Sequence, residues 1–185
     1  MTTVSHFAVA VVRGDSGWTA SELDLTNAAD VEDVADRLRD VDLNASASLL
    51  FVESDDLYLA ILRLDDGEDL RLFGSDSAFV DESRLGKLLL GDLTLGAVEP
   101  ALEPAEALDD EEFAEESDEE PAEERPAADP SVNPIGDADL LADLGISAHM
   151  LLDLCGTDGL LPADVTAEIC QVIGCADEVE ELREG

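Results

Sequence analysis

The stretch from residue 99 to residue 131 most constrains how this chain can fold. It carries 15 acidic residues against one basic residue, a net charge of −14 over 33 positions, and five prolines. Its few apolar residues are scattered, so it cannot bury enough surface to offset the entropy of ordering, and its like charges push it open. We therefore expect a disordered, acidic, proline-rich linker over residues 99–134, which leaves residues 1–98 and 135–185 as the folded parts.

The residues before this linker show the pattern of a mixed α+β domain over 1–98. Apolar runs bounded by turn residues predict strands, and the 3.6-residue spacing of Val31, Val34, Ala35, Leu38 and Val41 predicts a helix capped by Asn27 or Asp30. The expected order is ββαβββα, with strands at 7–13, 18–23, 49–53, 57–63 and 70–73 and a second helix over 78–90. This order predicts a five-stranded antiparallel sheet with two helices on one or both faces. It is also the order of profilin-like domains such as the roadblock and longin groups.

The residues after the linker predict a small helical bundle over 135–185. We expect a helix over 135–144 that ends at Gly145 and another over 148–154 that is capped by Ser147. A third helix begins at Pro162 and stops at Gly174, and residues 176–184 add a last acidic turn or two. About fifty residues lie near the lower size limit for independent folding.

The charge of the whole chain limits what it can bind. It has 47 acidic and 9 basic residues, a net charge of −38. Binding phosphate backbones needs Lys and Arg to replace counterions, so we expect no direct binding of nucleic acid or of an anionic membrane. A basic protein would be attracted, and Trp18 in the second strand, with Leu108 and Phe113 in the linker, could anchor such an interface.

No catalytic motif stands out in the sequence, so we expect no enzyme activity, no catalytic residue and no cofactor. Gly-x-Ser-x-Gly, a phosphate-binding loop and His-Glu-x-x-His are all missing. His149, Cys155, Cys170 and Cys175 could form a zinc site, but structural zinc uses cysteine pairs in loops. Cys155 and Cys170 fall within helical patterns, so we expect no metal. Reduced thiols, with neither a secretory signal nor an apolar run of membrane-spanning length, predict a cytoplasmic protein.

Two stretches of the sequence resemble a bacterial family, the tRNA adenosine deaminase-associated proteins. The first is residues 7–13 with Gly17, Trp18, Glu22 and Leu23, and the second is residues 136–146 with 160–162 and Ile173-Gly174. The resemblance implies association with a tRNA adenosine deaminase and no activity of its own. The chain also lacks the His-x-Glu and Pro-Cys-x-x-Cys motifs that such zinc enzymes need.

Four functions stay open at this point. The first is an accessory protein that binds a basic partner, with the deaminase as the candidate. The second is a mimic of nucleic acid that inhibits an RNA-binding protein. The third is a scaffold that self-associates, for example as a homodimer through the N-terminal domain, although a charge of −38 on each subunit opposes this. The fourth is an enzyme with an unrecognised carboxylate site.

Overall fold

The fold is built on one antiparallel sheet. The computed structural model describes residues 6–54, 57–93, 134–157 and 160–185. The strands are β1 (His6–Gly14), β2 (Gly17–Glu22), β3 (Ala47–Ser54), β4 (Tyr58–Asp65), β5 (Asp69–Gly74) and β6 (Ile135–Gly136). They lie in the order β2-β1-β3-β4-β5-β6, and every neighbouring pair is antiparallel.

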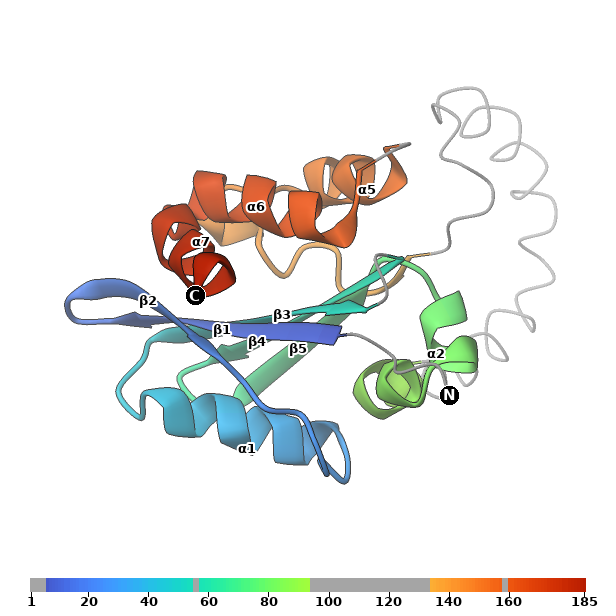
Figure 1. Ribbon diagram of the computed structural model, residues 1–185, viewed down its shortest axis with the longest axis horizontal. Helices are drawn as coiled ribbons and strands as arrows, with labels where there is room; N and C mark the ends of the chain where they lie inside the picture. The colour runs from blue at the N-terminus through green and yellow to red at the C-terminus, as the bar shows by residue number, and fades with distance from the viewer. Residues whose placement is uncertain (1–5, 55–56, 94–133, 158–159) are drawn as a thin grey trace, which may run out of the picture.

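The central strands are buried on both faces. All eight residues of β3 are buried, as are the inner six of β4. Successive side chains in a strand point to opposite faces, so a strand that is buried at every position requires cover on both sides. Helices lie above and below the sheet in Figure 1 and supply that cover.

Residues that precede position 94 cover the first face. Helix α1 (Val31–Val41) buries Val31, Val34, Ala35 and Leu38. The side chain of Asp30 caps this helix by accepting a hydrogen bond from Asp33 N at 2.9 Å, which supports one of the two caps expected from the sequence. Helix α2 (Ala78–Glu82) follows β5, and residues 84–93 are helical after a break at Ser83, so the helix expected over 78–90 is interrupted.

The C-terminal residues cover the second face. Helices α5 (Ala148–Gly156), α6 (Pro162–Ile173) and α7 (Ala176–Glu184) lie on the side of the sheet opposite α1 (Figure 1). Their apolar side chains share one core with the sheet. This core includes Val9, Val11, Leu49, Phe51, Ile61 and Phe73 from the strands and Leu151, Val165, Ile169, Cys170 and Val179 from the helices. None of the helices in the described ranges is long and apolar enough to cross a membrane.

The α+β class with an antiparallel sheet and several helices is confirmed, and two details differ from the sequence prediction. The sheet has six strands rather than five, because residues 135–136 pair with β5. The helix expected over 135–144 is therefore wrong, and only its last three residues form a 3-10 helix, η2 (Ala142–Leu144). Gly136 has φ +91°, and a Cβ there would lie 2.2 Å from Leu72 O, so this close approach requires glycine.

The expected linker over 99–134 lies outside the described residues except for residue 134. The division of the chain into 1–98 and 135–185 also stays a prediction. What the structure adds is that these two parts pack on each other through a shared core.

Candidate interaction surface

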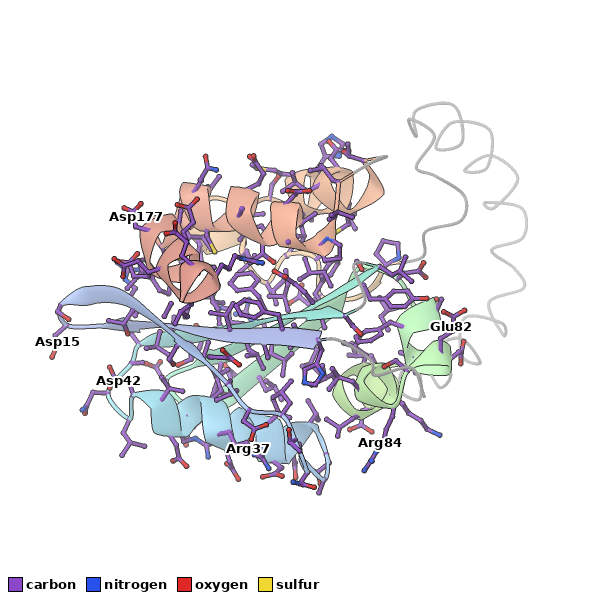
Figure 2. All side chains as sticks on the ribbon, viewed as in Figure 1. Asp15, Arg37, Asp42, Glu82, Arg84 and Asp177 are labelled. Carbon is purple, nitrogen blue, oxygen red and sulfur yellow. The ribbon has the colours of Figure 1, made fainter. Side chains whose placement is uncertain are left out.

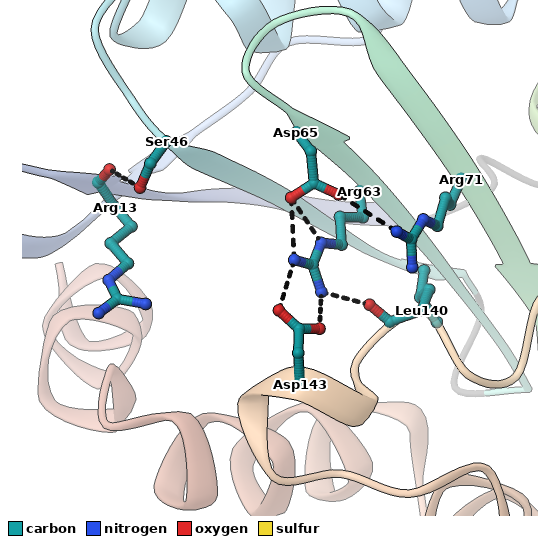
Figure 3. A network of polar contacts seen from close by, with 7 residues as sticks. All are labelled: Arg13, Ser46, Arg63, Asp65, Arg71, Leu140 and Asp143. Carbon is teal, nitrogen blue, oxygen red and sulfur yellow. Dashed lines mark hydrogen bonds and ion pairs between the residues drawn. The ribbon is translucent and has the colours of Figure 1, made fainter.

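Arg63 links the sheet to the C-terminal segment that leads into helices α5, α6 and α7. This residue belongs to β4, and its side chain is 6% exposed. Its guanidinium donates to Leu140 O at 2.6 Å, to Asp143 Oδ2 at 2.8 Å and to Asp65 Oδ1 at 2.9 Å (Figure 3). Hydrogen bonds from Arg63 hold the pKa of Asp143 below its usual range, while Asp143 and Asp65 raise the pKa of Arg63. One buried cation therefore joins the sheet to the segment that leads into η2.

A second ion pair, in which only the carboxylate is buried, attaches the C-terminal helix to the sheet. Arg183 of α7 donates to Glu53 of β3, whose side chain is 9% exposed. The Arg183 guanidinium also lies 4.8 Å from the centre of the Phe7 ring, within the range of a cation–π contact. Because Glu53 is buried, its charge needs this partner, and the pair places α7 over the side of the sheet that contains β1 and β3.

Once Arg183 is engaged, the outer surface of α6 and α7 carries carboxylates without balancing cations. We call this set of residues the α6–α7 acidic surface: Asp164, Glu168, Asp177, Glu178, Glu180, Glu181 and Glu184. All are exposed except Glu178, which is half-buried. Asp177 projects from α7 away from the sheet in Figure 2. Such a surface attracts cationic side chains and repels phosphate.

Helix α1 is acidic too, but its carboxylates are partly neutralised. Arg37 pairs with Asp33 at 3.2 Å, and Arg39 pairs with Asp36. Arg37 also donates to Asp24 O at 2.7 Å and to Thr26 O at 3.1 Å, so it braces the loop before the helix. Of the two helical layers, the α6–α7 side thus presents more uncompensated negative charge, although Glu32 and Asp40 of α1 are also exposed.

The described cysteines are not set up as nucleophiles. All three are free, and burial raises the pKa of Cys155 to about 12. The pKa of Cys170 is also raised, first by its hydrogen bond with Cys175 and then by burial. The thiols of Cys155 and Cys170 therefore stay protonated near neutral pH. In the described part of the chain no group of three or more His, Cys, Asp and Glu side chains could hold a metal ion. His149 Nε2 instead lies 3.3 Å from Asp153 Oδ2.

A hollow on the first face also lacks a catalytic arrangement among the residues that the structure describes. It measures about 370 Å³ and is lined by the loop 25–28, by His6 and by residues 82–85 and 88. Its one carboxylate, Glu82, is hydrogen bonded to the hydroxyl of Tyr58. A smaller hollow, of about 210 Å³, lies between α6 and α7 and has Asp164, Glu180 and Arg183 at its polar part.

Of the three residues expected at an interface, only Trp18 is described. It lies in β2, half-buried, against the core beneath α7, and the Arg13 guanidinium is 5.9 Å from its ring centre. Its role at an interface stays a prediction. Leu108 and Phe113 lie outside the described residues.

Sequence reasoning missed two ion pairs in which one member is buried: buried Arg63 with Asp143, and buried Glu53 with Arg183. A signal was present, because Arg63 stands between Leu62 and Leu64, and Glu53 follows the apolar run 49–52. A charged residue within a fully apolar strand must find a buried partner from elsewhere in the chain. The identity of that partner could not be read from the sequence.

The chain matches a known protein family. A family model described as Rv3753c-like tRNA adenosine deaminase-associated protein matches residues 6–176. No curated protein and no solved structure matches the chain. The likeness to profilin-like domains therefore stays a prediction.

Proposed function

The chain belongs to the tRNA adenosine deaminase-associated protein family, and from this premise we propose that it is a non-catalytic accessory protein that binds a basic partner, the tRNA adenosine deaminase itself. The family description supports the association with a deaminase. The observation that supports a basic partner is the α6–α7 acidic surface. There seven carboxylates stand beside one guanidinium, which is already engaged with Glu53.

The chemistry of the chain supports an accessory role rather than a catalytic one. The sequence lacks the His-x-Glu and Pro-Cys-x-x-Cys motifs with which a zinc deaminase activates water. The family description also names an associated protein rather than the deaminase. Three free cysteines suit a reducing compartment, and we place the protein in the cytoplasm together with the partner it would serve.

The experiment that tests this function is a titration of the purified full-length protein with its tRNA adenosine deaminase. We expect a complex whose Kd rises at least about tenfold between about 0.05 M and about 0.5 M salt, because screening weakens attraction between unlike surfaces. An absence of binding at the lower salt concentration would refute the partnership. A complex insensitive to salt would refute the electrostatic basis.

A pair of matched variants locates the surface. Glu180→Gln with Glu181→Gln removes two exposed carboxylates from α7, and Glu32→Gln with Asp40→Asn removes the same charge from α1. We expect the α7 variant to weaken binding and slow association, and the α1 variant to do so much less. Equal effects would mean that only net charge matters.

Adding tRNA separates an accessory protein from a mimic of nucleic acid. If the protein is an accessory factor, tRNA joins the complex and all three components migrate together. If the protein occupies the tRNA site, tRNA displaces it in proportion to its concentration. Displacement would replace the accessory function with inhibition.

A further inference from the structure

In the part of the chain that the structure describes, the outer edge of β2 is an unpaired strand edge. β2 is the first strand of the sheet, and among the described strands it pairs only with β1. Its register against β1 is continuous from Gly17 to Glu22, so no bulge disrupts it, and it contains neither proline nor lysine. A bulge, a proline or a lysine is what usually protects an edge strand from pairing with an added strand, and β2 has none of them.

The phase of the β1–β2 hydrogen bonds shows which backbone groups face outward. Leu23 N donates to Ala8 O at 2.9 Å, and these two residues are directly opposite when the register is continued. Hydrogen-bonded and non-hydrogen-bonded pairs alternate along an antiparallel pair. Trp18, Ala20 and Glu22 therefore turn their N–H and C=O groups away from β1, and no residue in the described ranges hydrogen bonds to them.

The surroundings of this edge favour a cationic occupant. Helix α7 lies against β2 and carries five carboxylates, with its one arginine engaged by Glu53. Asp15 lies at the tip of the β1–β2 hairpin (Figure 2), and Glu22 ends the strand. A second copy of this chain would bring a further charge of −38, and residues 99–131 of the same chain would bring −14, so both are repelled.

We propose that the outer edge of β2 docks an extended basic segment of a partner protein, which adds to the sheet as a further strand beside the carboxylates of α7. The outward groups of Trp18, Ala20 and Glu22 supply the main-chain hydrogen bonds, and α7 selects for lysine and arginine. This inference rests on the proposed function for its choice of a basic partner, and it names the surface and the shape of the segment.

The test uses the full-length protein and a synthetic peptide of about eight residues that alternates lysine and valine, long enough to span β2. Binding is followed by NMR together with hydrogen exchange of the amides of Trp18, Ala20 and Glu22. We expect saturating peptide to slow hydrogen exchange of the outward amides of Trp18, Ala20 and Glu22. A peptide with glutamate in place of lysine tests the charge, and one methylated on alternate backbone nitrogens tests the hydrogen bonds; both should fail to bind.

Ala20→Pro is the decisive variant. Proline there removes an outward N–H and none of the bonds to β1, so the strand can persist at an edge. The matched control, Ala20→Val, keeps the N–H, and thermal melts of both confirm that they fold. We expect Ala20→Pro to weaken peptide binding about tenfold relative to Ala20→Val, since one hydrogen bond is lost and its acceptor is left unpaired.

Four results would overturn the proposal. They are no binding of the lysine peptide, equal binding of the methylated or glutamate peptide, unchanged exchange at β2, and equal affinity of the two Ala20 variants. Self-association that Ala20→Pro abolishes would also overturn it, because the occupant would then be a second copy. If the deaminase does not bind, the proposed function fails while the peptide result still supports strand addition. If the deaminase binds the Ala20→Pro variant as well as the wild type, the proposed function holds and strand addition is refuted.

Discussion

Replacing Arg63 by methionine should show how strongly the two layers depend on one buried cation. Methionine keeps much of the length of the side chain and removes the guanidinium. Three groups then lose their donor: the carboxylates of Asp65 and Asp143 and the carbonyl of Leu140. Only some of these three acceptors are exposed to water that could replace the lost Arg63 donor.

The loss of unfolding free energy follows from how exposed each of these acceptors is. The Asp143 side chain is 59% exposed, so water takes over and its share is under about 1 kcal/mol. The Asp65 side chain is 20% exposed, and its buried Oδ2 already lacks a hydrogen bond, with Arg71 Nη2 3.9 Å away. Leaving this charge and the Leu140 carbonyl without a donor should bring the total to about 3 kcal/mol. That corresponds to a drop in Tm of about 6–12 °C for a chain of this size.

Urea unfolding, followed by circular dichroism and by the fluorescence of the single tryptophan, measures this loss. Asp143→Asn is the matched control, because it weakens only the exposed part of the network, and it should cost less than about 1 kcal/mol. An Arg63→Met variant that loses no more than Asp143→Asn would refute the reasoning. The attachment of the second layer would then depend on apolar packing alone.

Three further predictions concern pH, thiols and cleavage. Because Arg63 depresses the pKa of Asp143, the stability that this pair contributes is present above about pH 4 and is lost as pH falls through the depressed value; Asp143→Asn should remove that part of the acid titration, and an unchanged curve would contradict it. With its pKa raised to about 12, Cys155 should be alkylated about a thousandfold more slowly in the folded protein than in urea, and equal rates by mass spectrometry would contradict its burial. Proteolysis within 99–131 should leave two fragments that elute together, because they share a core, and fragments that separate would refute that dependence.

The sequence predicts the local structure of the chain well. The hairpin of β1 and β2, the helix that Asp30 caps and the start of α6 at Pro162 follow from turn residues, apolar spacing and caps. Each of these signals acts within a few residues. They need no knowledge of what packs on the element.

The long-range arrangement could be predicted less fully. The unbroken apolar runs of β3 and β4 indicate a sheet covered on both faces, yet they do not say which helices supply the second cover. β6 has two residues and no strand pattern of its own, because its place depends on the approach of Gly136 to Leu72. The acidic character of the candidate surface was evident from composition. Its location on α6 and α7 depended on learning that Arg183 is engaged by Glu53.

The core between the sheet and helices α5, α6 and α7 takes its residues from the two ends of the chain, and this has a consequence during synthesis. The face formed by Val11, Leu49 and Phe51 leaves the ribosome long before Ile169 and Val179, which cover it. The interval from Phe73 to Leu140 is about 70 residues, or about 4–14 s at ordinary rates of translation. For that time a growing chain displays an uncovered apolar sheet, and the residues that emerge in the interval include 99–131, the most acidic stretch of the sequence. Their repulsion would keep neighbouring nascent chains on one messenger apart until each can complete its own fold.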